Sequence, residues 1–244
     1  MLDSKIFRYK YLKSTNSKIV ELQSKEKLDE FSIVITSCQT AGRGQQGNFW
    51  ESENRQNLTF SMIFYPKFIK ISNLFDLTCI VTVGMIDALE LLCPNIKIKW
   101  ANDIYVENKK IAGILIENRL IGDRIDYSIV GIGLNVNQTN FLRAPNPTSL
   151  KLLLGSELDK EKLLIVITDA IKKRYCQGSA NGIENIRKIY HSRLFWIGEK
   201  HIFQDKNGLF IGTISGVDKT GHLIVIDSES REKKYSFKEI TYIN

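Results

Sequence analysis

The chain has 244 residues, of which 43% are hydrophobic and 25% are charged, and its net charge is +7. This length suits one large domain, or one domain with a small appendage, and the apolar content is enough for a well-filled core. The sequence contains no low-complexity stretch and no repeat at solenoid or propeller spacing, which excludes a repeat architecture.

Cysteine and histidine spacing argues against a disulfide framework or a zinc site. The four cysteines are scattered without a CxxC pair, and the three histidines lie in the last quarter of the chain. Such cysteines are typical of reduced core thiols and favour the cytoplasm. No secretory signal is evident. The longest apolar stretch, residues 74–92, includes Asp76, Asp87 and Glu90, so we expect a core helix and no membrane span.

Helices and strands are predicted in turn over the first third of the chain. Hydroxyl and amide side chains at 14–17 precede an apolar run to residue 22 and indicate a helix start. Residues 31–38 predict a strand, and a glycine-rich loop follows at 41–48. Residues 58–64 alternate with a period of two and predict a half-buried strand, before a helix over 74–91.

The segment 96–134 predicts a series of hairpins. Short strands at 96–100, 104–106, 110–117 and 126–134 are separated by turn residues. Their sheet should therefore be mixed or largely antiparallel.

The pattern changes after two helices that we predict at 159–176 and 182–191. Four short strands follow, joined by turns that contain Asp, Gly or Ser, at 199–203, 210–217, 222–227 and 233–237. They predict a small β-barrel. We therefore expect an α+β domain at 1–195, with helices against one face of its sheet, and a small domain at 196–244.

The glycine-rich loop is the first candidate site. Gly42, Gly44 and Gly47 let the backbone adopt unusual angles and come close to a ligand, and successive N–H groups can bind an anion. Arg43 lies among them and can present its planar guanidinium to a carboxylate or phosphate. The loop lacks the GK[ST] of a Walker motif, and a flexible surface turn is the alternative interpretation.

Two further stretches could line a cleft. Residues 99–103 precede residues 110–113, and a lysine here that points into a cleft would neutralise phosphate. The alternatives are exposed lysines at a hairpin tip and a turn-forming role for Asp103. In 131–137, glycines within a strand indicate either close approach of a ligand or a bulge, and Asn135 could contact an adenine edge or cap a turn.

The order of these stretches is more specific than any one of them. Ser14-Thr15-Asn16, the QTAGRG run at 39–44 with Trp50, KWAND at 99–103, KIAG at 110–113 and GIGLN at 131–135 follow one another along the chain. In this order the chain resembles the biotin–protein ligases over nearly its whole length. The resemblance implies a catalytic α+β domain and a small SH3-like C-terminal β-barrel. It also implies biotin, ATP and Mg²⁺ as ligands, and the biotin carboxyl carrier domain of a carboxylase as the partner.

The resemblance also implies roles for individual residues. The biotin-binding residues would be Ser14, Thr15, Asn16, Gln39, Gly42, Arg43, Gly44, Gln45, Lys110, Gly113 and Gly133. The ATP-binding residues would be Arg43, Gln45, Trp50, Asn102, Lys110 and Asn135. The catalytic residues would be Lys110, Arg43 and Asp103, with the metal ligands left open.

The implied chemistry brings two anions together. Two unit charges 4 Å apart repel by roughly 4 kcal/mol at an effective dielectric constant of 20. Arg43, Lys110 and Mg²⁺ would lie between the biotin carboxylate and the α-phosphate of ATP. Asp103 would then take the proton of the acceptor lysine.

The chain departs from the family pattern at three places. Gln45, Gln46 and Asn48 stand in the glycine loop where relatives often have arginines, and Ala101 replaces a proline in KWAND. The motifs begin at Ser14, which leaves no room for an N-terminal DNA-binding domain, so no operator DNA is expected. Either a monomer or a homodimer fits.

Two rival functions remain open from the sequence. A lipoate or octanoate ligase has the same catalytic fold and also targets a lysine, although the Gly-Arg-Gly loop and Lys-Ile-Ala-Gly favour biotin. A nucleic-acid-binding module would explain the net charge of +7, but the lysines are spread out and not interleaved with aromatic residues.

Overall fold

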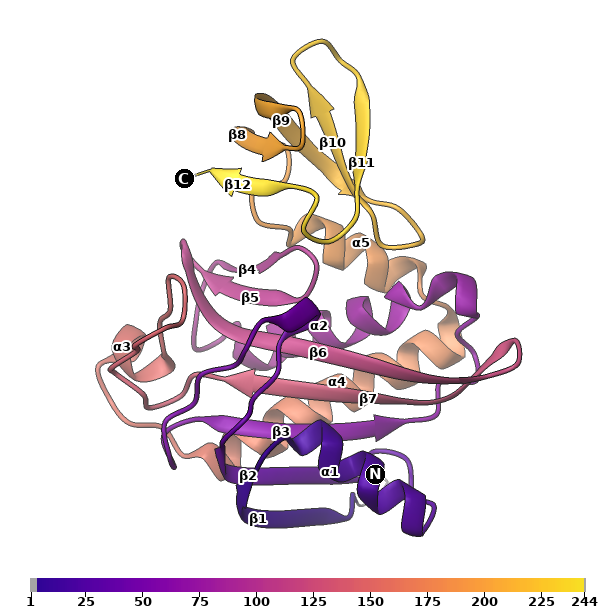
Figure 1. Ribbon diagram of the computed structural model, residues 1–244, viewed down its shortest axis with the longest axis vertical. Helices are drawn as coiled ribbons and strands as arrows, with labels where there is room; N and C mark the ends of the chain where they lie inside the picture. Colours follow the sequence, from indigo (N-terminus) through magenta and orange to yellow (C-terminus); the bar gives the residue numbers. More distant parts are fainter. Residues whose placement is uncertain (1–3, 244) are drawn as a thin grey trace.

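The structure is a computed structural model that describes residues 4–243. A seven-stranded mixed sheet forms its centre, with strands in the order β1-β2-β3-β7-β6-β5-β4 (Figure 1). The strands are β1 (Ile6–Leu12), β2 (Ile33–Gln39), β3 (Leu58–Phe64), β4 (Ile96–Lys99), β5 (Asp103–Val106), β6 (Lys109–Ile121) and β7 (Arg124–Leu134). Only β1 and β2 pair in parallel, which confirms the predicted mixed, largely antiparallel sheet.

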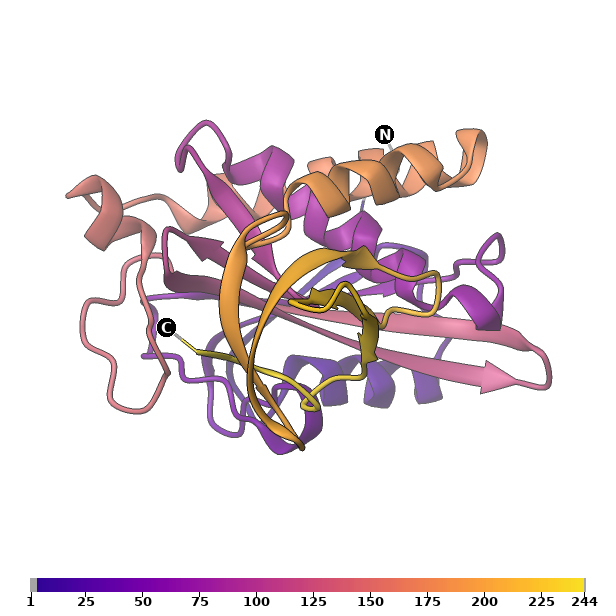
Figure 2. The same ribbon diagram turned by 90° about the horizontal axis from the view of Figure 1, so that it is seen from above.

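Helices cover both faces of this sheet, whereas the sequence predicted helices on one face. The helices are α1 (Thr15–Lys25), α2 (Phe75–Leu89), α3 (Leu150–Leu154), α4 (Lys160–Asn181) and α5 (Glu184–Ser192). Figure 2 shows α2 and α4 on one side of the sheet and α1 on the other. Gly84 of α2 makes the close packing of α2 and α4 possible, because a Cβ there would lie 2.8 Å from the Cα of Ile171.

Strand β3 is buried along its whole length, although its period of two predicted a half-buried strand. Phe60 and Phe64 belong to the main hydrophobic core, which includes α2. Ile63 points the other way, into a smaller cluster with Ile19 of α1. The polar members of the alternation, such as Ser61, also point to the α1 side and are buried beneath it. Polar side chains in this strand therefore mark a covered hollow rather than a solvated face.

The C-terminal strands form a second, five-stranded antiparallel sheet in the order β11-β10-β9-β8-β12. Its strands are β8 (Lys200–Asp205), β9 (Gly208–Val217), β10 (Leu223–Asp227), β11 (Glu232–Tyr235) and β12 (Thr241–Ile243). The predicted barrel is open over the described residues, because β11 and β12 are the two edges of this order.

The two sheets share one hydrophobic core. Phe203, Leu223 and Val225 of the C-terminal sheet are fully buried in the same cluster as Ile96 and Ile98 of β4. Figure 1 shows the C-terminal sheet above α5 and the β4–β5 hairpin. Over residues 4–243, none of the helices combines the length and apolar character that crossing a membrane requires.

Candidate functional site

The site lies on the α1 face of the large sheet, where the strand register brings small residues side by side. One row of cross-strand partners consists of Asp103, Gly113, Gly133 and Thr59, and the next consists of Leu115, Gly131 and Ser61. Glycines at the centre of these rows remove the side chains that would otherwise fill the face. A hollow of about 650 Å³ results, open to solvent at its mouth.

The first turn of α1 supplies one end of this hollow. The helix starts within the predicted stretch 14–17, and Ser14 caps it by accepting a hydrogen bond from the backbone N–H of Ser17. The backbone N–H of Thr15 donates to Gln39 Oε1 over 2.9 Å. Ser61 Oγ lies 2.6 Å from Asn16 Oδ1 and 2.7 Å from Thr15 Oγ1. The predicted residues Ser14, Thr15, Asn16 and Gln39 therefore meet at one end of the hollow and are held in fixed orientations.

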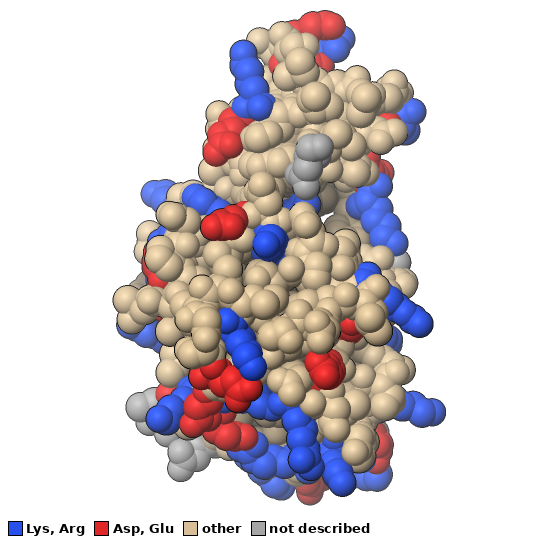
Figure 3. All heavy atoms as spheres, turned by 90° about the vertical axis from the view of Figure 1, so that its left-hand side faces the viewer, with Lys and Arg blue, Asp and Glu red and all other residues tan. Residues whose placement is uncertain are grey.

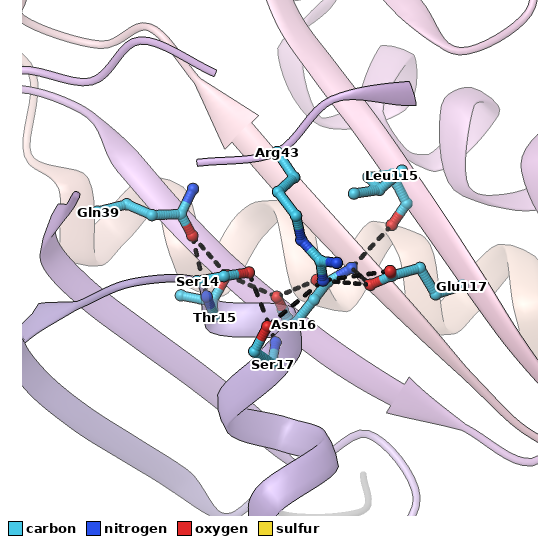
Figure 4. Close-up of polar contacts among 9 residues, drawn as sticks. Ser14, Thr15, Asn16, Ser17, Gln39, Arg43, Leu115 and Glu117 are labelled. Carbon is cyan, nitrogen blue, oxygen red and sulfur yellow. Dashed lines mark hydrogen bonds and ion pairs between the residues drawn. The ribbon is translucent and has the colours of Figure 1, made fainter. Parts of the chain in front are cut away.

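Glu117 of β6 completes this end and was not predicted (Figure 4). Asn16 Nδ2 donates to Glu117 Oε2 over 2.6 Å, and Arg43 Nη2 lies 3.2 Å from Glu117 Oε1. Arg43 also donates to Ser17 Oγ over 3.4 Å. Glu117 thus links the helix end to the glycine loop through one carboxylate.

Lys110 and Asp103 form a second ion pair beside the glycine row. Lys110 Nζ lies 2.7 Å from Asp103 Oδ2, and both side chains are about a quarter exposed. A Cβ on Gly113 would lie 3.3 Å from Lys110 Cε and 3.4 Å from Asp103 Oδ1, so the pair faces the hollow directly above this glycine. The neighbouring Asn102 is buried, and its amide donates to the backbone carbonyl of Ile114. Asn102 thereby supports the turn that carries Asp103.

The structure does not bring Arg43 and Lys110 together as the sequence analysis expected. Gly113 lies beside the Lys110–Asp103 pair, and Glu117 follows it by four residues on β6. Four residues of a strand span roughly 13 Å. The two cations therefore lie apart in the hollow, Arg43 at the α1 end and Lys110 beside the glycine row, and each is paired with its own carboxylate.

The glycine loop is a folded hairpin rather than an irregular turn. The backbone N–H of Trp50 donates to Gly42 O over 3.0 Å, and that of Gly44 donates to Asn48 O over 2.7 Å. A Cβ on Gly42 would lie 2.5 Å from Trp50 O, so close approach requires a glycine there. Among the loop glycines, only Gly47 has a positive φ, of 84°. The loop closes over the hollow, which Arg43, Gly44, Gln45 and Asn48 line.

Trp50 and Asn135 form the opposite end, where two buried polar atoms have no partner among the described residues. The Trp50 indole packs on Gly133, at which a Cβ would lie 2.3 Å from Trp50 Cε2. Asn135 Nδ2 donates to Thr148 O over 2.9 Å, which fixes the amide and leaves Oδ1 without a donor. Trp50 Nε1 is likewise buried without an acceptor. Since buried polar atoms are normally paired, this end is suited to a ligand that carries a planar ring and an N–H donor.

A smaller hollow of about 340 Å³ adjoins Trp50 at this end. Its lining residues are Phe49, Trp50, Glu51, Lys110, Asn135, Ala144, Pro145 and Pro147. The segment from Ala144 to Pro147 therefore forms one wall next to the unpaired Asn135 oxygen. Sequence patterns gave no sign of this wall, because it lies between predicted elements.

The C-terminal sheet also contributes to the site. Phe237 lines the main hollow. Trp100 Nε1 donates to Gly221 O over 3.0 Å, and Tyr190 OH donates to Ala101 O over 2.8 Å. Lys99 points away from the hollow and lies 4.8 Å from the ring centroid of Tyr242. Burial lowers the pKa of Lys99, because its ammonium group is removed from water. The turn that carries Asp103 is therefore held from outside the large sheet.

Comparison with known proteins gives a consistent result. A profile of the biotin/lipoate A/B protein ligase family matches residues 9–135. The bifunctional ligase/repressor BirA of Bacillus subtilis is 31% identical over 85% of this chain and 65% of its own length. BirA of Bacillus spizizenii is 30% identical over 93% of this chain and 71% of its own length. The chain thus spans about two thirds of the length of these relatives.

A relative from Paracoccus denitrificans, a biotin–[acetyl-CoA-carboxylase] ligase, is 27% identical over 90% of this chain and 93% of its own length. The structure of the biotin protein ligase from Aquifex aeolicus in complex with biotin and ATP is similar with a TM-score of 0.79. That comparison covers 98% of both chains at 25% sequence identity. By its motifs, its fold and these matches, the chain belongs to the biotin/lipoate A/B protein ligase family.

Proposed function

We propose that the chain is an ATP-dependent biotin–protein ligase, which forms biotinyl-5'-AMP and transfers biotin to a lysine of a biotin carboxyl carrier domain. The observation that carries this proposal is the order of groups along one hollow. A polar end at Asn16 comes first, then the Lys110–Asp103 ion pair, then the Trp50 and Asn135 end. Biotinyl-AMP has the same order of parts: a polar ring, an acyl phosphate and an adenine.

The α1 end suits the ring system of biotin. The ureido group has two N–H donors and one carbonyl acceptor. Asn16, Thr15 and Gln39 offer amide and hydroxyl groups that are already oriented by neighbours. Arg43 and Gly44 of the glycine loop also line the hollow, and the loop would cover the ring. Gly113 and Gly133 lie beneath the Trp50 indole, and the lack of a side chain at each lets that ring lie close to the sheet.

Lys110 is the main cation for the first step. A carboxylate oxygen of biotin attacks the α-phosphorus of ATP, the bond to the bridging oxygen breaks, and pyrophosphate leaves with the electron pair. Lys110 neutralises both anions at this point. Its ammonium group, which lies 2.7 Å from Asp103 Oδ2, leaves that carboxylate and binds oxygens of the α-phosphate and of the biotin carboxylate instead. Arg43 acts at the ring end, through Glu117 and the loop backbone.

Asp103 acts in the second step. The amine of the acceptor lysine attacks the acyl carbon, the bond to the phosphate oxygen breaks, and AMP leaves. The attacking nitrogen must lose a proton, and a free lysine has a pKa of roughly 10.4. Asp103 is the one carboxylate among the described residues that line the main hollow. Once Lys110 has turned to the phosphate, Asp103 is free to take that proton.

ATP enters as its magnesium complex. Among residues 4–243 no group of three His, Cys, Asp or Glu side chains is placed to hold a metal ion. Mg²⁺ bound to nucleotides commonly keeps phosphate oxygens and water as most of its ligands, with one or two carboxylates. The adenine lies against Trp50, and its amino group donates to Asn135 Oδ1.

The polar end of the hollow favours biotin over lipoate or octanoate. An alkyl chain or dithiolane ring has no N–H or carbonyl group with which to meet the amide and hydroxyl groups gathered there, whereas the ureido group of biotin has both. The charge distribution also gives no support to a nucleic-acid-binding module. On the face drawn in Figure 3, basic and acidic side chains are interspersed and form no continuous stripe.

The test is incubation with MgATP and labelled biotin, with and without a carrier domain. We expect biotin-dependent pyrophosphate exchange, and label on the carrier only when ATP is present. GTP should fail, because its O6 is an acceptor that faces another acceptor, Asn135 Oδ1. Labelling with lipoate or octanoate, but not with biotin, would overturn the proposal.

We further propose that residues 1–195 and 196–244 are its two domains. We also propose that it acts in the cytoplasm, since two of its cysteines are buried free thiols.

Gln45 sets how firmly the adenylate is held. It lines the hollow, and an arginine in its place would add a charge-assisted hydrogen bond to the phosphate. Gln45→Arg should therefore slow the release of free biotinyl-AMP by about tenfold or more. Chromatography of the released adenylate, in turnover without a carrier, measures this. Gln204→Arg makes the same change at an exposed position of β8 and should have no effect. Equal release by Gln45→Arg and wild type would contradict the role of Gln45.

A further inference from the structure

Glu51 joins two segments that lie about ninety residues apart in the sequence. Its Oε1 accepts from the backbone N–H of Leu142 over 2.8 Å. Its Oε2 accepts from the N–H groups of Arg143 and Ala144 over 2.8 Å and 2.9 Å. Three consecutive amides that point at one carboxylate form a backbone anion site, here filled by a side chain of the same chain. Hydrogen bonds to an ionised acceptor are about twice as strong as neutral ones.

The clamped segment is the wall of the nucleotide end. Ala144, Pro145 and Pro147 line the smaller hollow beside Asn135 and Trp50. The far end of the segment is tied to β6 by two backbone hydrogen bonds, from Lys110 N to Asn146 O and from Thr148 N to Lys110 O. The N-terminal end of the segment has fewer contacts, since Leu142 is 90% exposed. Glu51 is therefore the main tie at the N-terminal end.

We propose that Glu51 is a positioning residue for ATP, because its carboxylate fixes the wall against which the adenine is bound. The inference rests on the proposed function and assigns part of its nucleotide site. Glu51 follows Trp50 directly in the chain, so one short stretch both supplies the aromatic surface and secures the opposite wall. A wall that is already ordered spares ATP the entropy of ordering it on binding.

Glu51 stays ionised under ordinary conditions. Burial opposes ionisation, but the N–H groups of Leu142, Arg143 and Ala144 outweigh it, and the pKa of Glu51 lies below its usual value. The clamp therefore persists throughout the neutral range. It is lost only as the pH falls through that lowered pKa.

The test is Glu51→Gln, with Glu53→Gln as the matched control. A glutamine has one acceptor oxygen, so its amide NH₂ would face at least one backbone N–H and break the clamp. Glu53 is exposed on the same stretch, and its side chain has no hydrogen bond or ion pair within residues 4–243. Pyrophosphate exchange gives KM for ATP and for biotin separately. Hydrogen exchange of amides 142–144 reports the clamp itself without any activity.

We expect Glu51→Gln to raise KM for ATP about tenfold, the equivalent of one or two hydrogen bonds. KM for biotin and kcat should stay within about twofold. Amides 142–144 should lose protection, Glu53→Gln should match wild type, and Glu51→Asp, which keeps the charge, should fall between.

Three outcomes would overturn the inference: unchanged protection of these amides, lost protection with an unchanged KM for ATP, or equal rises in both KM values. If Glu51→Gln does not fold, the same readings on Glu51→Asp decide the question. Failure of the proposed function is distinct, since wild type would then show no biotin-dependent exchange at all.

Discussion

Lys110→Ala should lower biotin-dependent pyrophosphate exchange by about a thousandfold. Without the ammonium group the two reacting anions repel by roughly 4 kcal/mol, and each 1.36 kcal/mol of barrier is a factor of ten in rate. The ion pair of Lys110 with Asp103 adds to this effect, because the variant leaves a carboxylate beside the phosphates. The variant therefore loses the attraction between Lys110 and the reacting anions, and the Asp103 carboxylate then repels the phosphates.

The fold of this variant should be intact, because a partly exposed ion pair contributes only about 0–1 kcal/mol to stability. The measurement is exchange of labelled pyrophosphate into ATP, with thermal unfolding alongside. Lys109→Ala removes a neighbouring lysine whose side chain is exposed and should leave exchange unchanged. Exchange at the wild-type rate in Lys110→Ala would refute the role of Lys110.

Gly131→Ala should weaken biotin binding by about a hundredfold. The new Cβ would lie 2.3 Å from Asn16 Oδ1, inside any normal contact distance. Asn16 cannot simply turn away, because Ser61 and Glu117 hold the two ends of its amide. Displacing the amide breaks one or both of these bonds and leaves buried polar groups unpaired, at a cost of about 1–3 kcal/mol each.

A double-mutant cycle isolates this mechanism. If the methyl group acts through Asn16, Gly131→Ala should add little to the loss caused by Asn16→Ala alone. Titration calorimetry with biotin in the absence of ATP measures all four proteins. Fully additive losses would show that the methyl group acts elsewhere, for example by blocking the ligand directly.

The parts of the site that follow strand periodicity could be predicted from the sequence. Gly113 and Gly133 both line the hollow, and Glu117 could have been found by the same reasoning. It lies four residues beyond Gly113 on β6, so its side chain points to the same face. An acidic residue directly after the apolar run 111–116, in step with Gly113, is the signal that was missed.

Other features depend on contacts between distant segments and left no local pattern. Strand β1 is different, because Phe7, Tyr9 and Tyr11 alternate with Arg8 and Lys10, and this period of two was overlooked. The clamp at Glu51 and the pocket residue Phe237 come from loops whose partners are far away in the sequence. The separation of Arg43 from Lys110 was also hidden, because charge pairing with Glu117 cannot be read from the loop alone.

The single core beneath both sheets has a consequence for engineering this protein. The Trp100 indole donates a hydrogen bond to Gly221 O, and Trp100 lies two residues before Asn102. The last fifty residues therefore help to fix the turn that carries Asp103. A chimera that takes its C-terminal module from a relative would have to keep the backbone acceptor for this indole, which is Gly221 O here. Otherwise the exchanged module would displace Asp103, although no side chain of that module takes part in the reaction.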